Sequence, residues 1–255
     1  MSYSDLVGFN NPRVIPMTKS GSFEFFDNYS NSVKHLQPEL YSEIEKILNT
    51  EFHSFYKTNK RKPVVLDIGS AGILPYDVNF TEKIVILDLF DKPEYLQLGE
   101  SSEWITGDIL SDTVVSELTK NYRFDFIIMS SLLHHLCNEK NNIIKNLKIC
   151  FFHSRLLLSK NGKICIFEST CSNWITKFED FFYPVYSWIL LKILKFTYVR
   201  MISSDEIITT LNDTGLRTQC IPFKQPRHIA QMYWRIPTKI YPLKINAIFA
   251  YENQR

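Results

Sequence analysis

Three aspartates that each close a short apolar run are the residues of this sequence best placed to do chemistry. Asp67 ends the run VVLD, Asp88 ends KIVILD and Asp108 ends WITGD, and successive acids are 21 and then 20 positions apart. A carboxylate only accepts hydrogen bonds, and it has room for two donors, such as the two hydroxyls of a ribose. In open α/β folds the carboxyl ends of parallel strands share one edge, where ligands bind. The spacing therefore predicts that the three acids border one ligand site.

A loop of small residues follows the first of these acids. After Asp67 the chain reads IGSAGIL, which places Gly69, Ser70, Ala71 and Gly72 in succession. Glycine adopts backbone angles that are forbidden to residues with a Cβ, and small side chains leave the backbone amides uncovered. We therefore expect a ligand to approach the main chain closely at this loop.

Paired histidines come just after a fourth apolar run. His134 and His135 follow the predicted strand 124–129, with Ser130 at its end. A neutral imidazole can remove a proton from a hydroxyl, so either histidine is a candidate catalytic base. The alternative is that the pair only holds the loop by hydrogen bonding and packing. A metal site would need a third ligand, and we expect none because His153 falls on the following helix.

The elements that must position these residues follow from hydrophobic periodicity. Five βα units followed by two strands predict an α/β fold, with a Rossmann-like, seven-stranded, mostly parallel sheet and helices on both faces. The predicted strands are 64–67, 83–88, a run ending at Asp108, 124–129, 162–169, 216–223 and 244–251. The predicted helices include 38–56, 139–158 and 203–214, the last opened by a capping box of Ser203 and Glu206.

Composition favours a globular protein of nearly neutral charge. The 255 residues are 45% hydrophobic and 22% charged with a net charge of +2, and we expect a single domain over 1–255. The basic cluster KTNKRK is typical of a solvated turn, so no nucleic-acid partner is expected. Five cysteines without a CxxC pair predict buried thiols in a reducing compartment. Because the N-terminus also lacks a signal segment, we expect a cytoplasmic protein.

Two aromatic segments flank the predicted core. Residues 1–34 form an N-terminal arm, and residues 171–202 are dense in aromatic and aliphatic side chains. We interpret 171–202 as a helical lid insertion over an apolar acceptor, with an oligomer interface or a peripheral membrane contact as alternatives. The insertion is too short and too charged to span a membrane, and the oligomeric state stays open. The candidate substrate contacts in the two segments are Tyr29, Tyr183, Tyr186 and Trp188.

The serial motifs of the chain resemble those of the class I S-adenosylmethionine-dependent methyltransferases. They read VVLDIGSAG, KIVILDLF, WITGDIL, RFDFIIMSSLLHHL and LLSKNGKICIFEST, and the likeness covers residues 62–170. It is greatest to the small-molecule branch that carries Leu-His-His after the fourth strand. The loop departs from the family pattern Asp-x-Gly-x-Gly-x-Gly, because Ala71 and Ile73 replace its second and third glycines. A nicotinamide oxidoreductase is disfavoured because G-x-G-x-x-G is absent after the first strand.

The resemblance implies S-adenosyl-L-methionine as cofactor and a small-molecule acceptor. It implies that Asp88 binds the ribose next to Leu89, and that Asp108 and Ile109 bind the adenine; the alternative role for Asp108 is to cap a helix. We expect methyl transfer to a hydroxyl oxygen of an apolar or ring-bearing biosynthetic intermediate. The alternatives are N- or C-methylation of a lipid-linked or quinone-like acceptor, and a non-catalytic cofactor-binding scaffold. The expected cofactor contacts are Asp67, Gly69, Ser70, Ala71, Gly72, Asp88, Leu89, Asp108, Ile109 and Ser130.

Overall fold

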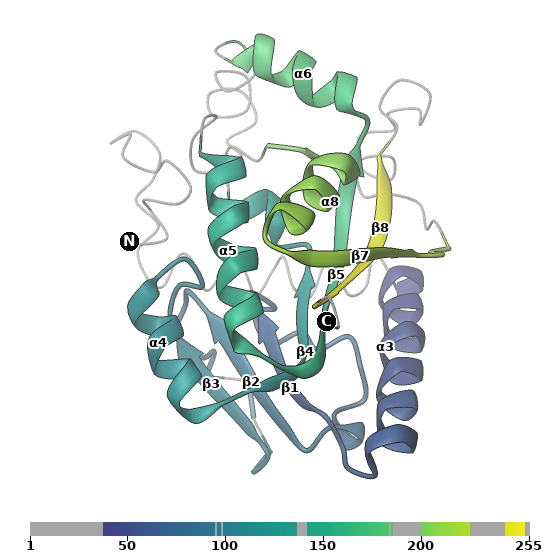
Figure 1. Cartoon of the computed structure of the whole chain (residues 1–255), viewed down its shortest axis with the longest axis vertical. Helices are drawn as coiled ribbons and strands as arrows, with labels where there is room; N and C mark the ends of the chain where they lie inside the picture. The colour runs from purple at the N-terminus through teal and green to yellow at the C-terminus, as the bar shows by residue number, and fades with distance from the viewer. Residues whose placement is uncertain are drawn as a thin grey trace.

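An eight-stranded sheet forms the centre of the protein (Figure 1). The computed structural model describes residues 38–94, 96–97, 99–136, 142–183, 185, 200–224 and 243–252. The strands are β1 (Val64–Ile68), β2 (Lys83–Asp88), β3 (Ser102–Thr106), β4 (Phe124–Ser130), β5 (Leu158–Cys171), β6 (Ile202–Ser203), β7 (Leu216–Ile221) and β8 (Lys244–Glu252).

The strand order is β3-β2-β1-β4-β5-β8-β7, with β6 paired to the end of β5. β8 runs antiparallel to both β5 and β7, whereas the other pairings are parallel. The expected seven-stranded, mostly parallel sheet is confirmed, and the two-residue β6 is an additional short strand. The order reverses between β1 and β4, so the carboxyl ends of these strands border the crevice at which open α/β sheets hold ligands.

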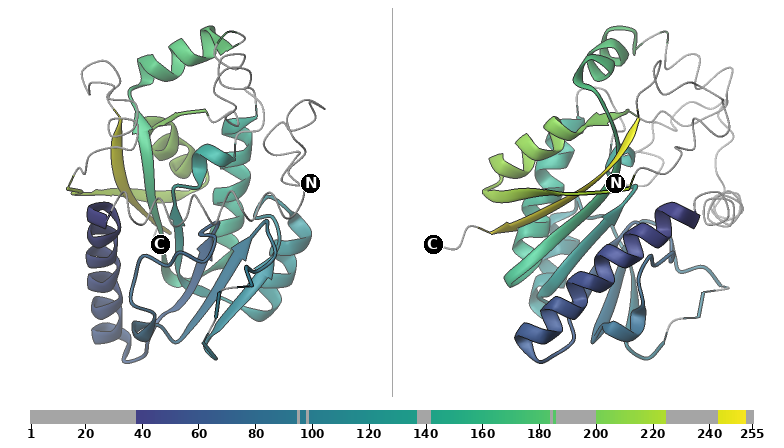
Figure 2. Two further views of the ribbon diagram at one scale, coloured as in Figure 1. Left: turned by 180° about the vertical axis from the view of Figure 1, so that it is seen from behind. Right: turned by 90° about the vertical axis from the view of Figure 1, so that its right-hand side faces the viewer.

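Helices cover both faces of the sheet, as the sequence predicts. Figure 2 shows α3 (Pro38–Asn59) on one side of the sheet and α5 (Ile143–Leu157) with α8 (Ser204–Asp213) on the other. The buried residues of α4 (Asp112–Asn121) belong to the same apolar cluster as those of α5 and α8. The helix that follows β5 does not cover a face of the sheet in this way. This helix, α6 (Asn173–Phe181), lies beyond the end of β5, at the top of Figure 1.

Strands β1, β2 and β4 are mainly apolar because both of their sides are covered. In β2, Ile84 and Ile86 pack in the cluster with α3, whereas Val85 and Leu87 pack in the cluster with α4, α5 and α8. All four side chains are buried. The same alternation runs through β1 and β4, so the sheet lies between two apolar layers.

Some boundaries differ from those expected from the sequence. Strand β5 is longer than the predicted 162–169, because Leu158 already pairs with Phe124 before a shift in register. The capping box at α8 is confirmed: the Ser203 hydroxyl accepts the N–H of Glu206 at 3.1 Å, and the Glu206 carboxylate accepts the N–H of Ser203 at 2.9 Å.

The cysteines fit the prediction of buried thiols only in part. Cys150, Cys165 and Cys171 are free and buried, but Cys220 is exposed. The expectation is wrong for Cys220 because β7 is the edge strand of the sheet, so one of its sides faces solvent. Within the described residues, no helix has both the length and the apolar character needed to cross a bilayer.

Candidate functional site

Asp88, at the end of β2, is tied to the loop that follows β1. Its Oδ2 accepts the N–H of Ala71 at 3.0 Å, and its Oδ1 accepts the N–H of Phe90 at 3.1 Å. Burial raises the pKa of Asp88, and the hydrogen bonds from the backbone oppose that rise. Because a carboxylate oxygen has about two acceptor positions, each oxygen of Asp88 can still accept one further donor.

The loop after β1 turns through the left-handed region of backbone space. The φ angles are +69° at Gly69, +51° at Ala71 and +81° at Gly72. A Cβ on Gly69 would lie 2.5 Å from Cδ1 of Leu132, a side-chain end that can move aside, so it is the positive φ that favours glycine there. Ile73 is not among the described residues with a positive φ, which explains why the loop tolerates a side chain at that position.

Asp67 is a buried acid at the start of this loop. The hydroxyl of Tyr76 donates to its Oδ2 at 2.9 Å, whereas its buried Oδ1 has no hydrogen-bond partner. Burial raises the pKa of Asp67 to about 7, and the nearby charge of Asp88 adds to the rise. The hydroxyl of Ser70 is near enough to oppose this shift, but it makes no hydrogen bond of good geometry. A cationic or hydrogen-bond-donating ligand would supply the hydrogen bond that Oδ1 of Asp67 lacks.

A small cleft of about 70 Å³ opens where these strands end. Six of the expected cofactor contacts line it, and Asp67, Ser70, Gly72 and Ser130 do not. Ser130 instead ends β4, where it pairs with Phe167 of β5. The residues lining the cleft are Ile68, Gly69, Ala71, Leu87, Asp88, Leu89, Phe90, Gly107, Asp108, Ile109, Leu132, His135 and Leu136.

Asp108 reaches the cleft from the loop after β3. Its Oδ1 accepts the N–H of Leu110 at 2.8 Å, and burial raises its pKa. The N-cap of α4 is Ser111, so Asp108 does not cap that helix. Ile109 is only 4% exposed and forms part of the apolar wall of the cleft. The structure thus brings together the acids of the second and third strands, as their spacing indicates.

A buried glutamate on β5 organises the loop that carries the paired histidines. Glu168, which is 0% exposed, accepts the N–H of Leu133 at 2.7 Å through Oε2. Its Oε1 accepts from Nδ1 of His134 at 2.7 Å and from the N–H of Ser169 at 2.9 Å. Since the carboxylate is the acceptor, Nδ1 of His134 is the donor in this contact, and in a neutral imidazole the lone pair is then on Nε2.

The second histidine has a different environment. The ring of His135 lies 4.1 Å from that of His134, between centroids, and its Nδ1 is buried without a hydrogen-bond partner. Burial lowers the pKa of His135 well below the ordinary value of about 6.5, and the neighbouring His134 lowers it further. His135 is therefore neutral, and it lines the cleft while His134 is bound to Glu168.

Reasoning from the sequence missed two partners that the tertiary structure supplies. Glu168 was not identified as the partner of His134, and Tyr76 was not singled out. The only sequence signal for Glu168 is its place at the end of the strand next to β4. Within the described part of the chain, no group of three or more His, Cys, Asp or Glu side chains could hold a metal ion.

The aromatic insertion is described only in part. Tyr29, Tyr186 and Trp188 lie outside the described residues, and Tyr183 is half-buried just after α6. Asp180 of α6 forms an ion pair with Arg200 at 3.1 Å. The outer side of α6 is aromatic and exposed, with Trp174, Phe178 and Phe181 exposed by 59%, 56% and 78%.

Solved structures with a similar fold are methyltransferases. The CurJ carbon methyltransferase superposes with a TM-score of 0.56 at 19% identity, covering 94% of this chain and 60% of its own. Human N-acetylserotonin methyltransferase, solved in complex with S-adenosylmethionine, gives 0.55 at 15% identity, covering 99% and 63%. An O-methyltransferase family protein from Burkholderia thailandensis gives 0.55 at 10% identity, covering 97% and 68%.

This chain has the methyltransferase fold. It spans about three fifths of the length of the first two of these proteins, which are covered to 60% and 63%. No protein-family model matches the sequence, and no curated protein matches it in sequence. The methyltransferase fold is therefore established here by the course of the chain in space, and the activity has to be argued from the site.

Proposed function

We propose that this protein transfers the methyl group of S-adenosyl-L-methionine to a hydroxyl oxygen of a small apolar or ring-bearing acceptor. The observation that carries the proposal is the pair of Glu168 and His134, joined at 2.7 Å next to a cleft bordered by Asp88 and Asp108. A cleft at the ends of the strands and an oriented base beside it are the two parts that such a reaction needs.

The cleft offers a place for the nucleoside part of the cofactor. Asp88 has one open acceptor position on each oxygen, which suits the two ribose hydroxyls. The apolar side chains of Leu89 and Ile109 lie in the same wall and can enclose the adenine ring. The carboxylate of Asp108 borders that region and would accept the adenine amino group. Gly69 and Ala71 would bring the backbone close to the ribose.

Asp67 suits the methionine end of the cofactor. Its unpartnered Oδ1 lacks a donor, and an α-ammonium group would supply one. The positive charge would also lower the pKa of Asp67 from about 7, so that the acid is ionised in the complex. Ser70, Gly72 and Ser130 belong to the two strand ends beside this acid, and we assign them to the same end of the cofactor.

The chemistry asks the protein for positioning and for removal of one proton. The acceptor oxygen attacks the methyl carbon, the carbon–sulfur bond breaks, and its electron pair stays on sulfur to give S-adenosylhomocysteine. Nε2 of His134 takes the hydroxyl proton with its lone pair, and Glu168 stabilises the resulting imidazolium through Nδ1. The sulfonium is already activated, so in-line approach of the acceptor supplies most of the remaining barrier reduction.

His135 does not fit the role of base. Its pKa is well below the ordinary value, so it is a poor proton acceptor, and its ring lines the cofactor cleft. We assign it to the wall of the cofactor site. Tyr183 stays a candidate substrate contact, as do Tyr29, Tyr186 and Trp188, and we propose that the aromatic insertion encloses an apolar acceptor.

Calorimetric titration with S-adenosylmethionine, S-adenosylhomocysteine and NAD, in separate runs, tests the cofactor assignment. Micromolar binding of both adenosyl ligands with no binding of NAD is the expected result. If neither adenosyl ligand binds, the cofactor assignment is wrong. A screen of phenolic, alcoholic, amine and carbon acceptors with methyl-labelled cofactor then tests the reaction. Turnover of hydroxyl acceptors that is lost in His134→Ala supports the proposal, whereas cofactor binding without any turnover favours the scaffold.

A further inference from the structure

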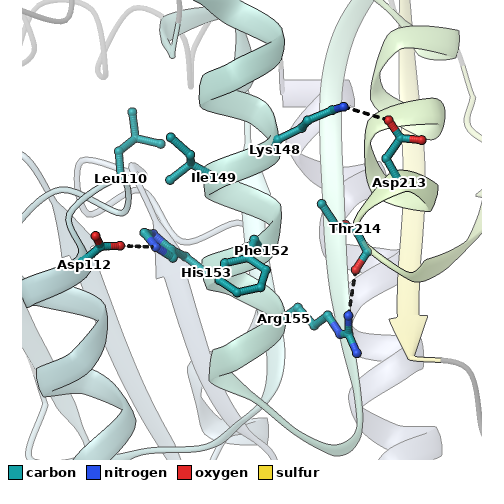
Figure 3. Close-up of a pocket in the computed structure, with 9 residues that line it drawn as sticks. All are labelled: Leu110, Asp112, Lys148, Ile149, Phe152, His153, Arg155, Asp213 and Thr214. Carbon is teal, nitrogen blue, oxygen red and sulfur yellow. Dashed lines mark hydrogen bonds and ion pairs between the residues drawn. The ribbon is translucent and has the colours of Figure 1, made fainter.

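His153 on α5 links the cofactor cleft to a second cavity on the outside of the sheet. The side chain is 4% exposed, and its two ring nitrogens contact two different elements. Nδ1 lies 2.7 Å from the carbonyl oxygen of Ile109, and Nε2 lies 2.9 Å from Oδ1 of Asp112. Figure 3 shows His153 reaching from α5 to Asp112, with Leu110 above the same cavity.

Two consecutive residues of one loop separate the two cavities. Ile109 lines the cofactor cleft, and Leu110 lines the outer cavity together with His153. This loop lies between the end of β3 and the start of α4, and the N–H of Gly107 at its start donates to the carbonyl of Asp88 in β2 at 2.7 Å. The Ile109 carbonyl is bound instead by a side chain, that of His153, at 2.7 Å.

The hydrogen positions follow from the partners. A carbonyl oxygen only accepts hydrogen bonds, so Nδ1 of His153 must donate to Ile109. The Asp112 carboxylate is also an acceptor, and its side chain is 97% exposed, so the contact at Nε2 is at the solvent edge. The buried bond to Ile109 is the one that can transmit structure to the cleft, whereas the exposed ion pair contributes little.

We propose that His153 is a positioning residue for S-adenosylmethionine, which sets the adenine-binding wall by donating a hydrogen bond from Nδ1 to the carbonyl of Ile109. The inference rests on the proposed function, because it takes the cleft to be the nucleoside site. His153 does not touch the cofactor in this arrangement and acts only through the main chain of Ile109.

The charged groups around the outer cavity do not compete for the Ile109 carbonyl. Lys148 pairs with Asp213 at 2.9 Å, and Nη1 of Arg155 donates to the carbonyl of Thr214 at 2.9 Å (Figure 3).

Two substitutions at this position separate the hydrogen bond from packing. An asparagine carries its amide nitrogen near the position of Nδ1, so His153→Asn should keep the donor to Ile109. A glutamine carries its amide nitrogen near the position of Nε2, so His153→Gln should face Asp112 and leave the carbonyl without its donor. Both variants keep a neutral amide in place of the ring, which makes them matched in polarity.

The measurement is the dissociation constant for S-adenosylhomocysteine by calorimetry, together with the thermal midpoint of each variant. We expect His153→Gln to weaken binding roughly five- to tenfold, the effect of one net hydrogen bond, and His153→Asn to recover most of that loss. The same loss should appear with adenosine alone, because it arises at the nucleoside end. Asp112→Asn is the control and should change either affinity by less than about twofold.

The outcomes distinguish this inference from the proposed function. If the unaltered protein binds neither S-adenosylhomocysteine nor adenosine, the cofactor assignment itself has failed. If the unaltered protein binds but His153→Gln and His153→Asn lose affinity equally, His153 serves packing and the positioning role is wrong. Unchanged affinity in a folded His153→Gln variant overturns it as well.

Discussion

Asp88 is the acid on which the cofactor assignment depends most, and its replacement by asparagine is the sharpest test. The two side chains have almost the same shape, so Asp88→Asn changes charge and hydrogen-bonding capacity with little change in packing. In the structure both carboxylate oxygens accept backbone N–H groups, from Ala71 at 3.0 Å and from Phe90 at 3.1 Å. An asparagine can satisfy only one of these donors, because its amide nitrogen is itself a donor.

The expected magnitude follows from that count. Each carboxylate oxygen has one acceptor position left for a ribose hydroxyl, and the amide nitrogen of asparagine removes one of the two positions. A hydrogen bond to a charged group contributes about 1.5–3 kcal/mol, so affinity for S-adenosylhomocysteine should fall roughly 10- to 150-fold. Binding by the unaltered protein should also weaken as pH falls toward the raised pKa of Asp88, because protonation removes an acceptor.

Calorimetry with S-adenosylhomocysteine between about pH 5 and 8 measures both effects. Asp91→Asn is the matched control, because it removes an acid three residues further along that does not line the cleft. Asp88→Asn should have lost the pH dependence that is attributed to this acid, whereas Asp91→Asn should retain it. A loss below about threefold in a folded Asp88→Asn protein would refute the ribose assignment.

Three further substitutions test other parts of the site. Glu168→Gln should lower kcat about 100-fold or more with little change in S-adenosylhomocysteine affinity, because a neutral amide cannot stabilise the imidazolium that forms on His134 as the carboxylate does; full turnover with the screened acceptor would contradict this. The pKa of Asp67, about 7, exceeds the unfolded value of about 3.9, so its contribution to stability is lost as pH rises from about 4 to 7. Asp67→Asn should therefore raise the thermal midpoint at pH 8 by several degrees while weakening cofactor binding, and an unchanged midpoint would argue against the raised pKa. Gly69→Ala should destabilise the protein by about 1–3 kcal/mol in a denaturant titration, since alanine would be strained at the φ of +69°; an unchanged midpoint would show that the loop adapts.

The fold was predictable because its signals are local and repeated. The runs that become β1, β2 and β4 are apolar on both sides, and only a sheet covered on two faces buries such runs completely. The capping box of Ser203 and Glu206 marks the start of α8 for an equally local reason, because both hydrogen bonds lie within four residues. Strand β6 could not be foreseen, since two residues carry no periodicity of their own.

The candidate site was predictable where it follows strand ends, and less so where it depends on contacts between distant residues. Asp88 and Asp108 border one cleft as their positions after apolar runs indicate. The choice between His134 and His135 could not be made from two identical neighbours in the chain. It depends on which ring meets Glu168, 34 residues further along, and on which ring is buried against the cleft.

The sequence by itself determined the order of the elements, the two-sided burial of the central strands and the edge at which the acids lie. These features follow from hydrophobic periodicity and from the positions of glycines, which are local properties of the sequence. Only the tertiary structure decided how the side chains at that edge pair. Glu168 with His134, Tyr76 with Asp67 and His153 with Ile109 are each separated by 9 to 44 positions in the chain. Such pairs form only when the packing of the sheet and helices sets the distances, and those distances in turn set the charge states and hydrogen positions on which the chemistry depends.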